Sequence, residues 1–396
     1  MGQRQASGAE TPVVNDSPPI SDISLIINTF QKPRHLGLVL QSIVSQEQVD
    51  GRFEVIVTDD GSTDSTAELV HSFATASPFP VRFITQPHDG FRLSQIRNRG
   101  ARIARGKALL FLDGDCMLPH DHVVAHLHRL RPGVALIGNC ARLTQDTSAA
   151  LAVDQLAPTD LTTLAPRSEK RSLAWRYRKA CWHNLTGHPS KPRLSGSNFS
   201  VWLEDFKRVN GFDERFVGWG QEDDDFGLRL RGAGVRLESI LDRTYSLHVW
   251  HPSDPSATRR WRDGPNIDYF SRRGRLVACR RGLSVRPATS LCWGLPDDIG
   301  TTTLGQHLSR MLGPATQAGS GSPCEVDLVV RPGTSRFSRP AECRLLLLAS
   351  GSATVETGLR QKADRIETMY APDDLDSRTL TEHLEHKLEA MLEAIG

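Results

Sequence analysis

The stretch LLFLDGDC, residues 109–116, joins a run of apolar residues to two aspartates that one glycine separates. Such a run is typical of a buried strand, and Gly114 allows the backbone to turn so that Asp113 and Asp115 both point outward. Two close carboxylates repel each other unless a cation or solvent lies between them. Oxygen ligands of this kind suit Mg²⁺ or Mn²⁺, which commonly bridge to substrate phosphates. The stretch therefore predicts a divalent metal site at the end of a buried strand, with a solvated acidic turn as the alternative.

The residues before this stretch alternate between strand and helix patterns. Strand-like runs and helix-like runs follow each other in the order 23–30, 34–46, 53–60, 65–76, 81–86, 93–105 and 107–115. Apolar strands separated by helices predict a Rossmann-like α/β fold with a mostly parallel sheet that is covered on both faces. In such sheets ligands bind outside the carboxyl ends of the strands. We therefore expect the acids of VTDDGSTDS (57–65) to lie beside those of the first stretch.

Four residues near this edge are predicted to contact a nucleotide together with Asp113. A carboxylate of Asp59 or Asp60 can accept a hydrogen bond from the N3–H of uracil or from a ribose hydroxyl, because a carboxylate is a pure acceptor. The alternative is a strand-to-helix turn with a helix cap. In QIRNRG (95–100), Arg97 and Asn98 lie on a helix face directed at the same edge, where an arginine suits phosphate. A surface arginine is the alternative.

Size and composition limit the classes of protein. The 396 residues include 48 basic and 46 acidic side chains, and the net charge of +2 argues against a nucleic-acid binder. Seven scattered cysteines without a CxxC spacing predict neither disulfides nor a zinc site. The N-terminus lacks the apolar segment of a signal peptide, and no run of eighteen apolar residues occurs. These features predict a cytoplasmic protein.

The chain is expected to divide into four parts. Residues 1–22 are polar and rich in Pro, Ser and Gly, which predicts a disordered tail, and residues 23–257 form the large domain. Residues 258–286 are rich in arginine and are interpreted as a solvated connector. A site for an anionic acceptor, or peripheral attachment to the inner membrane surface, is the alternative. Residues 287–396 predict a second, smaller α/β domain whose partner is unknown.

The segment NGFDERFVGWGQEDDDFGLRL (210–230) combines an aromatic residue with four consecutive acids. Acids in the first turn of a helix stabilise its dipole, which accounts for part of the run. An aromatic ring between glycines and beside carboxylates is also how proteins hold sugars, since the ring covers the apolar face of the pyranose and the acids bind its hydroxyls. We therefore expect Trp219, Glu222 and Asp224 to contact an acceptor sugar.

Several segments together resemble a known family. SLIINTF, VIVTDDGSTD, RNRGARIARGKALLFLDGD and above all GSNFSVWLEDFKRVNGFDERFVGWGQEDDDFGLRL resemble GT-A fold, family 2-type glycosyltransferases. Their second half is similar to the galactosyltransferase C-terminal module with its GWGxED block. The resemblance covers roughly residues 22–252 and implies a GT-A domain.

The resemblance also implies roles for individual residues. In that family the DxD motif holds a divalent metal on the nucleotide diphosphate, which implies Asp115 as a ligand and Asp113 as a ribose or metal contact. The acid after Glu in the GWGxED block is the catalytic base, here Asp223, and Glu222 binds the acceptor.

A histidine after the second helix completes the metal site in the family. YSLHVWHPSDP offers His248 first and His251 second. The block here carries Gln221 where the commoner form, GWGGED, has glycine.

The function expected from these features is an inverting, metal-dependent glycosyltransferase with Asp223 as base and Mn²⁺ or Mg²⁺ as cofactor. It would move a sugar, with galactose or N-acetylhexosamine favoured by the resemblance, from a UDP-sugar to a hydroxyl of a glycan or glycolipid acceptor. A metal stabilises the leaving diphosphate and a base removes the proton of the attacking hydroxyl. One alternative is a nucleotidyltransferase that forms a nucleotide sugar, although INTFQKPRH lacks the glycine-rich loop such enzymes use. The other is a sugar-nucleotide-binding protein without activity.

Overall fold

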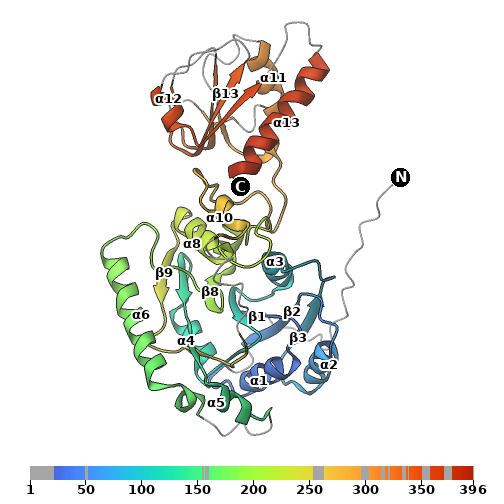
Figure 1. The fold of residues 1–396 in the computed structure, drawn as a ribbon, viewed down its shortest axis with the longest axis vertical. Coiled ribbons are helices and arrows are strands. Elements are labelled where there is room, and N and C mark those ends of the chain that lie inside the picture. Colours follow the sequence, from blue (N-terminus) through green and yellow to red (C-terminus); the bar gives the residue numbers. More distant parts are fainter. Residues whose placement is uncertain are drawn as a thin grey trace. The chain divides into compact units, whose positions relative to one another are not determined.

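The computed structural model describes the chain from residue 22 to residue 395 with gaps (Figure 1). The described residues are 22–49, 52–153, 156, 160–252, 263–295, 303–313, 317–319, 322–331, 336–337, 339–349, 357–369 and 377–395. The predicted N-terminal tail therefore lies outside the described residues, except for Asp22. Contacts divide the chain into two compact units, Met1–Gly264 and Pro265–Gly396, and each is described by itself.

The first unit contains a sheet with the strand order β3-β2-β1-β4-β8-β6-β9. Its strands are β1 (Ile23–Thr29), β2 (Phe53–Asp59), β3 (Val81–Thr85), β4 (Ala108–Asp113), β6 (Val134–Ile137), β8 (Asn198–Trp202) and β9 (Arg236–Ser239). Neighbours pair in parallel except at β8, which is antiparallel to both β4 and β6. The predicted mostly parallel Rossmann-like sheet is confirmed, and each element predicted before residue 116 is present within two residues of its expected bounds.

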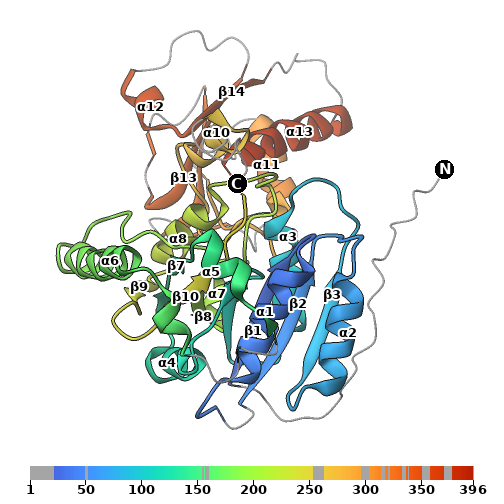
Figure 2. The same cartoon turned by 60° about the horizontal axis from the view of Figure 1, so that its bottom comes forward.

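Helices cover both faces of this sheet, and Figure 2 shows α1 (Pro33–Val44) and α2 (Thr66–Ala76) in front of it. Alternate residues of β1, β2 and β4 enter one apolar core with these two helices. Helix α3 (Leu93–Ile103) packs on β1 and β2 through Gly100, where an added Cβ would lie 2.7 Å from the Thr58 side chain. This close approach sets the distance between α3 and the sheet near the carboxyl ends of β1 and β2.

The face of the sheet opposite α1 and α2 carries a cluster of five phenylalanines. Their ring centroids lie 4.4–6.1 Å apart. The cluster joins β4, β8, α7 (Leu203–Arg208) and α8 (Glu222–Gly232), and consists of Phe111, Phe199, Phe206, Phe212 and Phe226. Because aromatic packing buries much area, this cluster holds the acidic start of α8 against the strand that ends in Asp113.

A second sheet of the first unit has the order β5-β10-β7. Its strands are β5 (Cys116–Met117), β7 (Cys140–Arg142) and β10 (Ser246–His248), and His248 pairs with Cys116 across β5 and β10. This register brings the strand that follows the DGD turn next to the histidine near the end of the unit. The remaining helices are α4 (His122–Arg129), α5 (Gln145–Ala150), the 3-10 turn at Leu161–Leu164 and α6 (Arg167–Leu185).

The second unit is a smaller α/β domain, as predicted. Its parallel sheet has the order β11-β12-β13-β14, with bounds Trp293–Gly294, Cys324–Arg331, Ala341–Ala349 and Arg365–Met369. Its helical elements are α10 (Asn266–Phe270), the 3-10 turn at Ala288–Ser290, α11 (Thr303–Leu312), α12 (Thr357–Lys362) and α13 (Ser377–Ile395). Leucines of α11 and α13 form one core with the sheet, while α12 contributes to a separate core of β12 and β13 residues.

The arginine-rich segment falls partly in this second unit. Residues 253–262 lie outside the described part of the chain, and residues from Pro265 onward belong to the second unit. Leu276 is buried in its core, and Arg280 donates to Glu389 Oε2 at 2.6 Å. Residues 265–286 thus pack with the C-terminal domain. Among the described residues, no helix is both long and apolar enough to cross a membrane.

Candidate active site

Arg97 of α3 joins two carboxylates that come from distant parts of the chain. Its side chain is 1% exposed, and Nη1 donates to Asp223 Oδ1 at 2.8 Å while Nη2 lies 3.4 Å from Asp113 Oδ1. Asn28 donates to the same Asp113 oxygen at 2.8 Å and accepts from Arg97 Nε at 3.2 Å. Nη2 also donates to the Gly196 carbonyl at 2.9 Å. The guanidinium is therefore held on every side and fixes both carboxylates.

Asp115 is surrounded by three nitrogen-bearing side chains. Its carboxylate lies 3.0 Å from Lys32 Nζ, 3.2 Å from His251 Nε2 and 3.6 Å from His248 Nε2. Burial alone would raise the pKa of Asp115, but the His251 hydrogen bond and the charges of His248 and Lys32 hold it well below its usual range. The hydrogen bond to Asp115 raises the pKa of His251, whereas burial lowers that of His248.

The donor set around Asp115 fits a divalent cation. Ligand atoms of Asp115, His248 and His251 lie within 4.8 Å of one another. One carboxylate oxygen and two imidazole nitrogens are side-chain atoms that can ligate a divalent cation. Both histidines considered from the sequence therefore reach the same carboxylate. Asp113 and Asp115 also form a group within 4.8 Å that includes Cys116.

The four acids at the start of α8 have different surroundings. Burial and the neighbouring Asp223 raise the pKa of Glu222 to about 8, and its Oε2 has no hydrogen-bond partner among the described residues. Burial raises the pKa of Asp224 to about 6, although Arg193 lies 3.5 Å away. Asp225 forms a fully buried pair with Arg229 at 2.7 Å. With its side chain 26% exposed, Asp223 is the most accessible of the four.

The carboxylate of Asp223 packs directly against the backbone of Gly196, which leaves no room for a side chain at residue 196. An added Cβ at Gly196 would overlap the Asp223 carboxylate and lie 2.5 Å from its Cγ. The loop before α8 also needs unusual backbone, because Gly218, Gly220 and Gln221 have φ of 84°, 106° and 70°. Between these residues Trp219 is 39% exposed. The loop thus presents an indole surface within a few residues of Asp223.

The carboxylates of Asp59 and Asp60 are engaged inside the protein. Asp59 accepts from Thr85 Oγ1 at 2.7 Å and from the Ser62 backbone N–H at 2.9 Å. Asp60 accepts from Gln86 Nε2 at 2.6 Å, and its residue is 5% exposed. The structure places both at the expected carboxyl edge, where they shape the turn after β2.

Asn98 faces away from the other predicted nucleotide contacts. It is fully buried, donates to the Phe212 carbonyl at 2.8 Å and to Glu214 Oε1 at 2.9 Å, and accepts from the Phe212 N–H. These bonds fasten the segment before the Trp219 loop to α3. The structure therefore brings Arg97 into the cluster with Asp113 and Asp223 and leaves Asn98 outside it.

Three residues of the site were not singled out from the sequence. Lys32, Asn28 and Gly196 contact Asp115, Asp113 and Arg97, respectively. Asn28 lies at the carboxyl end of β1 and Lys32 just after it, where side chains reach the ligand edge of a parallel sheet, so their position was a usable signal. Gly196 carries no such signal, because its role depends on a neighbour that is distant in sequence.

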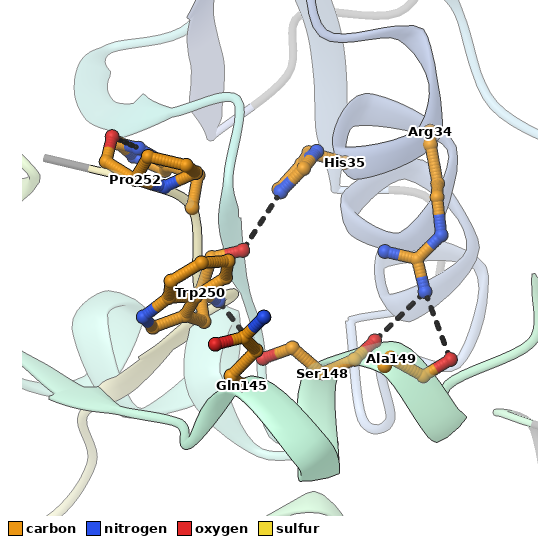
Figure 3. Close-up of a pocket in the computed structure, with 8 residues that line it drawn as sticks. Arg34, His35, Gln145, Ser148, Ala149, Trp250 and Pro252 are labelled. Atoms are coloured by element: carbon orange, nitrogen blue, oxygen red, sulfur yellow. Dashed lines mark hydrogen bonds between the residues drawn. The ribbon is translucent and has the colours of Figure 1, made fainter.

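A pocket of about 390 Å³ adjoins the Asp115 cluster (Figure 3). It lies between α1, α5 and the chain after β10, and is lined by Arg34, His35, Gln145, Ser148, Ala149, Trp250, His251 and Pro252. Across it, His35 Nε2 lies 3.2 Å from the Trp250 carbonyl, and Arg34 donates to carbonyls at the end of α5 (Figure 3). His251 belongs both to this pocket and to the Asp115 cluster.

Comparisons with known proteins point to one family. Residues 24–165 match the model of "Glycosyl transferase family 2", and residues 183–252 match that of "N-terminal domain of galactosyltransferase". The chain is 28% identical over 255 residues to validoxylamine A glucosyltransferase of Streptomyces hygroscopicus subsp. limoneus, covering 57% of this chain and 53% of that protein. It is 29% identical over 258 residues to chondroitin synthase of Escherichia coli, covering 61% of this chain and 36% of that one.

The matched region spans about half or less of the length of these curated relatives. Among solved structures, a mannosyltransferase of Pyrobaculum calidifontis in complex with GDP-Man and Mn²⁺ superposes with a TM-score of 0.44 at 19% identity, covering 60% of this chain and 59% of that one. Both matched family regions lie in the first unit, which contains the mostly parallel sheet and the acidic cluster. The first unit is therefore a family 2 glycosyltransferase domain of the GT-A type that carries a galactosyltransferase-like segment.

Proposed function

We propose that this chain is an inverting, metal-dependent glycosyltransferase that moves a sugar from a UDP-sugar to a hydroxyl of a glycan or glycolipid acceptor. The observation that carries the proposal is the position of one buried side chain, that of Arg97. Its Nη1 lies 2.8 Å from Asp223 Oδ1 and its Nη2 lies 3.4 Å from Asp113 Oδ1. One arginine thereby fixes the distance between a candidate base and the acid that opens the metal motif. A transfer reaction needs this fixed spacing, because the attacking hydroxyl and the leaving group must approach one carbon from opposite sides.

On the acceptor side, Asp223 receives the proton of the attacking hydroxyl. Its Oδ1 is bonded to Arg97, and Gly196 provides the space in which the carboxylate lies. Glu222, with a pKa of about 8, is protonated at neutral pH. It therefore does not supply a second carboxylate nucleophile and can donate a hydrogen bond to the acceptor. One accessible carboxylate beside the reacting carbon, without a second as nucleophile, supports a single displacement, which inverts the configuration.

On the donor side, Asp115, His248 and His251 would hold Mn²⁺ or Mg²⁺. When bound there, the ion supplies positive charge that stabilises the diphosphate leaving group. Lys32, at 3.0 Å from Asp115, adds a cation at the same place. Asp113 is bonded through Oδ1 and keeps a side chain that is 32% exposed, which supports its contact with a ribose hydroxyl or the metal.

The acceptor is proposed to lie over Trp219. The indole is partly exposed and stands close in sequence to Glu222, Asp223 and Asp224, so a pyranose stacked on it would direct its hydroxyl towards these carboxyls. The names of two relatives, chondroitin synthase and hyaluronan synthase, support a glycan acceptor. Galactose or an N-acetylhexosamine as the donor sugar is supported by the galactosyltransferase-like segment.

The test is a screen for UDP release with UDP-Gal, UDP-GalNAc, UDP-GlcNAc and UDP-Glc, each with glycan acceptors and with Mn²⁺ or Mg²⁺. For the active donor, Asp223→Asn is expected to lower kcat by about 10² to 10⁴ and to keep donor affinity, since it removes only the proton acceptor. Asp224→Asn, at a proposed acceptor contact, is the matched comparison and is expected to raise the KM for the acceptor while it keeps kcat within about threefold.

Three outcomes would contradict the proposal. Full transfer by Asp223→Asn would exclude this residue as base. Pyrophosphate release from UTP and a sugar phosphate would indicate a nucleotidyltransferase. Donor binding without turnover on any acceptor, with UDP-sugars or with GDP-Man, would indicate a binding protein.

A further inference from the structure

Helix α6 lies along the outer edge of the first unit (Figure 1). Several of its large apolar side chains are exposed to solvent. Of its 19 residues, Leu173 and Ala180 are buried. Trp175, Trp182 and Leu185 are 59%, 62% and 80% exposed. Tryptophan is highly buried on average in folded proteins, so two exposed indoles on one helix are unusual.

The two indoles lie on the side of α6 opposite to its packed side. Successive residues of an α-helix are rotated by about 100°, which places Trp175 and Trp182 about 140–180° from the directions of Leu173 and Ala180. The packed side contacts β7 and β9, and Asn184 donates to the Leu237 carbonyl at 2.9 Å. The indoles are separated by seven residues, or about 10 Å along the axis. They therefore form one stripe that points away from the domain.

Cations surround this stripe. The helix contains one acid, Glu169, and six exposed cations: Arg167, Lys170, Arg171, Arg176, Arg178 and Lys179. Glu169 accepts from the Arg142 backbone N–H. Lys179 Nζ lies 4.6 Å from the centroid of the Trp175 ring, a cation–π contact on the exposed side. No ion pair between these six side chains and a carboxylate is found in the described part of the chain. The positive charge of the face is thus uncompensated within the described structure.

We propose that the exposed face of α6, defined by Arg171, Trp175, Arg178, Lys179 and Trp182, docks the glycosyltransferase domain on an anionic lipid bilayer. Indole rings partition to the headgroup level of a bilayer, where one side of the ring is apolar and the N–H meets polar groups. Lysine and arginine on the same face bind the anionic headgroups. The face binds at the surface of the bilayer and does not span it.

The shape and chemistry of the face favour a bilayer over a glycan chain. A helix side that points outward is convex, whereas sugar sites are concave and surround their ligand. Sugar hydroxyls are bound largely by carboxylate and amide acceptors, and the five residues of the face offer none. A flat anionic surface, in contrast, needs a protruding row of cations with interfacial aromatic residues between them. This inference does not depend on which sugar the domain transfers.

The experiment measures co-sedimentation of the full chain with two kinds of vesicle, phosphatidylcholine alone and phosphatidylcholine mixed with phosphatidylserine, at low and high salt. We expect binding to the mixed vesicles only, with loss at high salt. Replacing Arg171, Arg178 and Lys179 together with Gln is expected to weaken binding by at least about 100-fold, since each cation near an anionic surface contributes roughly fivefold. The matched control replaces Arg52, Lys107 and Lys207, three exposed cations on other elements, with Gln and is expected to change binding less than about threefold.

A second variant, Trp175→Ser with Trp182→Ser, reports on the indoles themselves. Brominated phosphatidylcholine in the mixed vesicles is expected to quench part of the tryptophan fluorescence of the parent chain, and this part is expected to be missing in the double variant. Circular dichroism of both α6 variants checks that the helix is retained.

Four results would overturn the proposal. The first is no binding of the parent chain to mixed vesicles, and the second is equal weakening of binding by the α6 and control variants. The third is quenching that is unchanged in the double serine variant. The fourth is retention on an immobilised acidic polysaccharide that the α6 variants lose while vesicle binding is absent. The last would assign the face to a glycan.

Discussion

The raised pKa of Glu222 predicts that this residue makes the protein less stable as the pH rises. The carboxyl is buried beside Asp223, and its pKa of about 8 lies above the ordinary 4.5. Folding therefore favours the protonated form, so the stabilising contribution is full below about pH 4.5 and is lost as the pH rises through 8. Each pKa unit corresponds to about 1.4 kcal/mol, which gives on the order of 5 kcal/mol in total, of which about 3 kcal/mol falls between pH 5 and pH 8.

Glu222→Gln removes this titration and keeps the shape of the neutral side chain. The variant is expected to match the parent at about pH 5 and to be more stable by on the order of 3 kcal/mol at about pH 8. Glu47→Gln, at a side chain that is 67% exposed, is the matched control and is expected to follow the parent at both pH values.

The assay is urea unfolding followed by tryptophan fluorescence across this pH range. Six of the seven tryptophans precede residue 265, so the signal reports mainly on the unit that contains Glu222. A Glu222→Gln variant that stays parallel to the parent from pH 5 to pH 8 would refute the reasoning, because it would mean that the Glu222 carboxyl is hydrated in solution. A variant that is less stable than the parent at pH 8 would show that the ionised form is the stabilising one.

Three further changes test other parts of the structure. His251→Ala is expected to weaken Mn²⁺ binding by calorimetry at least as much as His248→Ala, because His251 makes the shorter contact with Asp115; loss of binding in the His248 variant alone would assign the ligand to that residue. Gly196→Ala is expected to lower kcat about 100-fold with little change in the urea midpoint, since the added Cβ displaces the base carboxylate. Gly37→Ala, where an added Cβ has only ordinary contacts, is the control and is expected to be neutral. Equal kcat in the two variants would show that the carboxylate can shift freely. A chain that ends at Gly264 is expected to unfold cooperatively and to keep nucleotide affinity, and loss of cooperative unfolding would show that the two units share a core.

Local sequence patterns were sufficient to predict the order of secondary structure and the edge of the sheet that carries the site. Apolar runs and helical periodicity depend on residues close in the chain, so the alternation through residue 115 could be read directly. The acids at the start of α8 were also visible as a charged run. The antiparallel direction of β8 and its place between β4 and β6 were not predicted, because strand order depends on which surfaces pack together and not on the pattern of any one strand.

The sequence by itself determined which residue types stand at the carboxyl edge, and the tertiary structure decided which of them are available for chemistry. Asp225 forms a buried ion pair with Arg229, and Asn98 donates hydrogen bonds to Phe212 and Glu214. Asp223, in contrast, remains partly exposed. These outcomes depend on contacts such as that between Arg97 and Asp223, which are 126 residues apart. Such a contact depends on the phenylalanine cluster that packs α8 onto the sheet, because burial and distance, unlike periodicity, are properties of the assembled core.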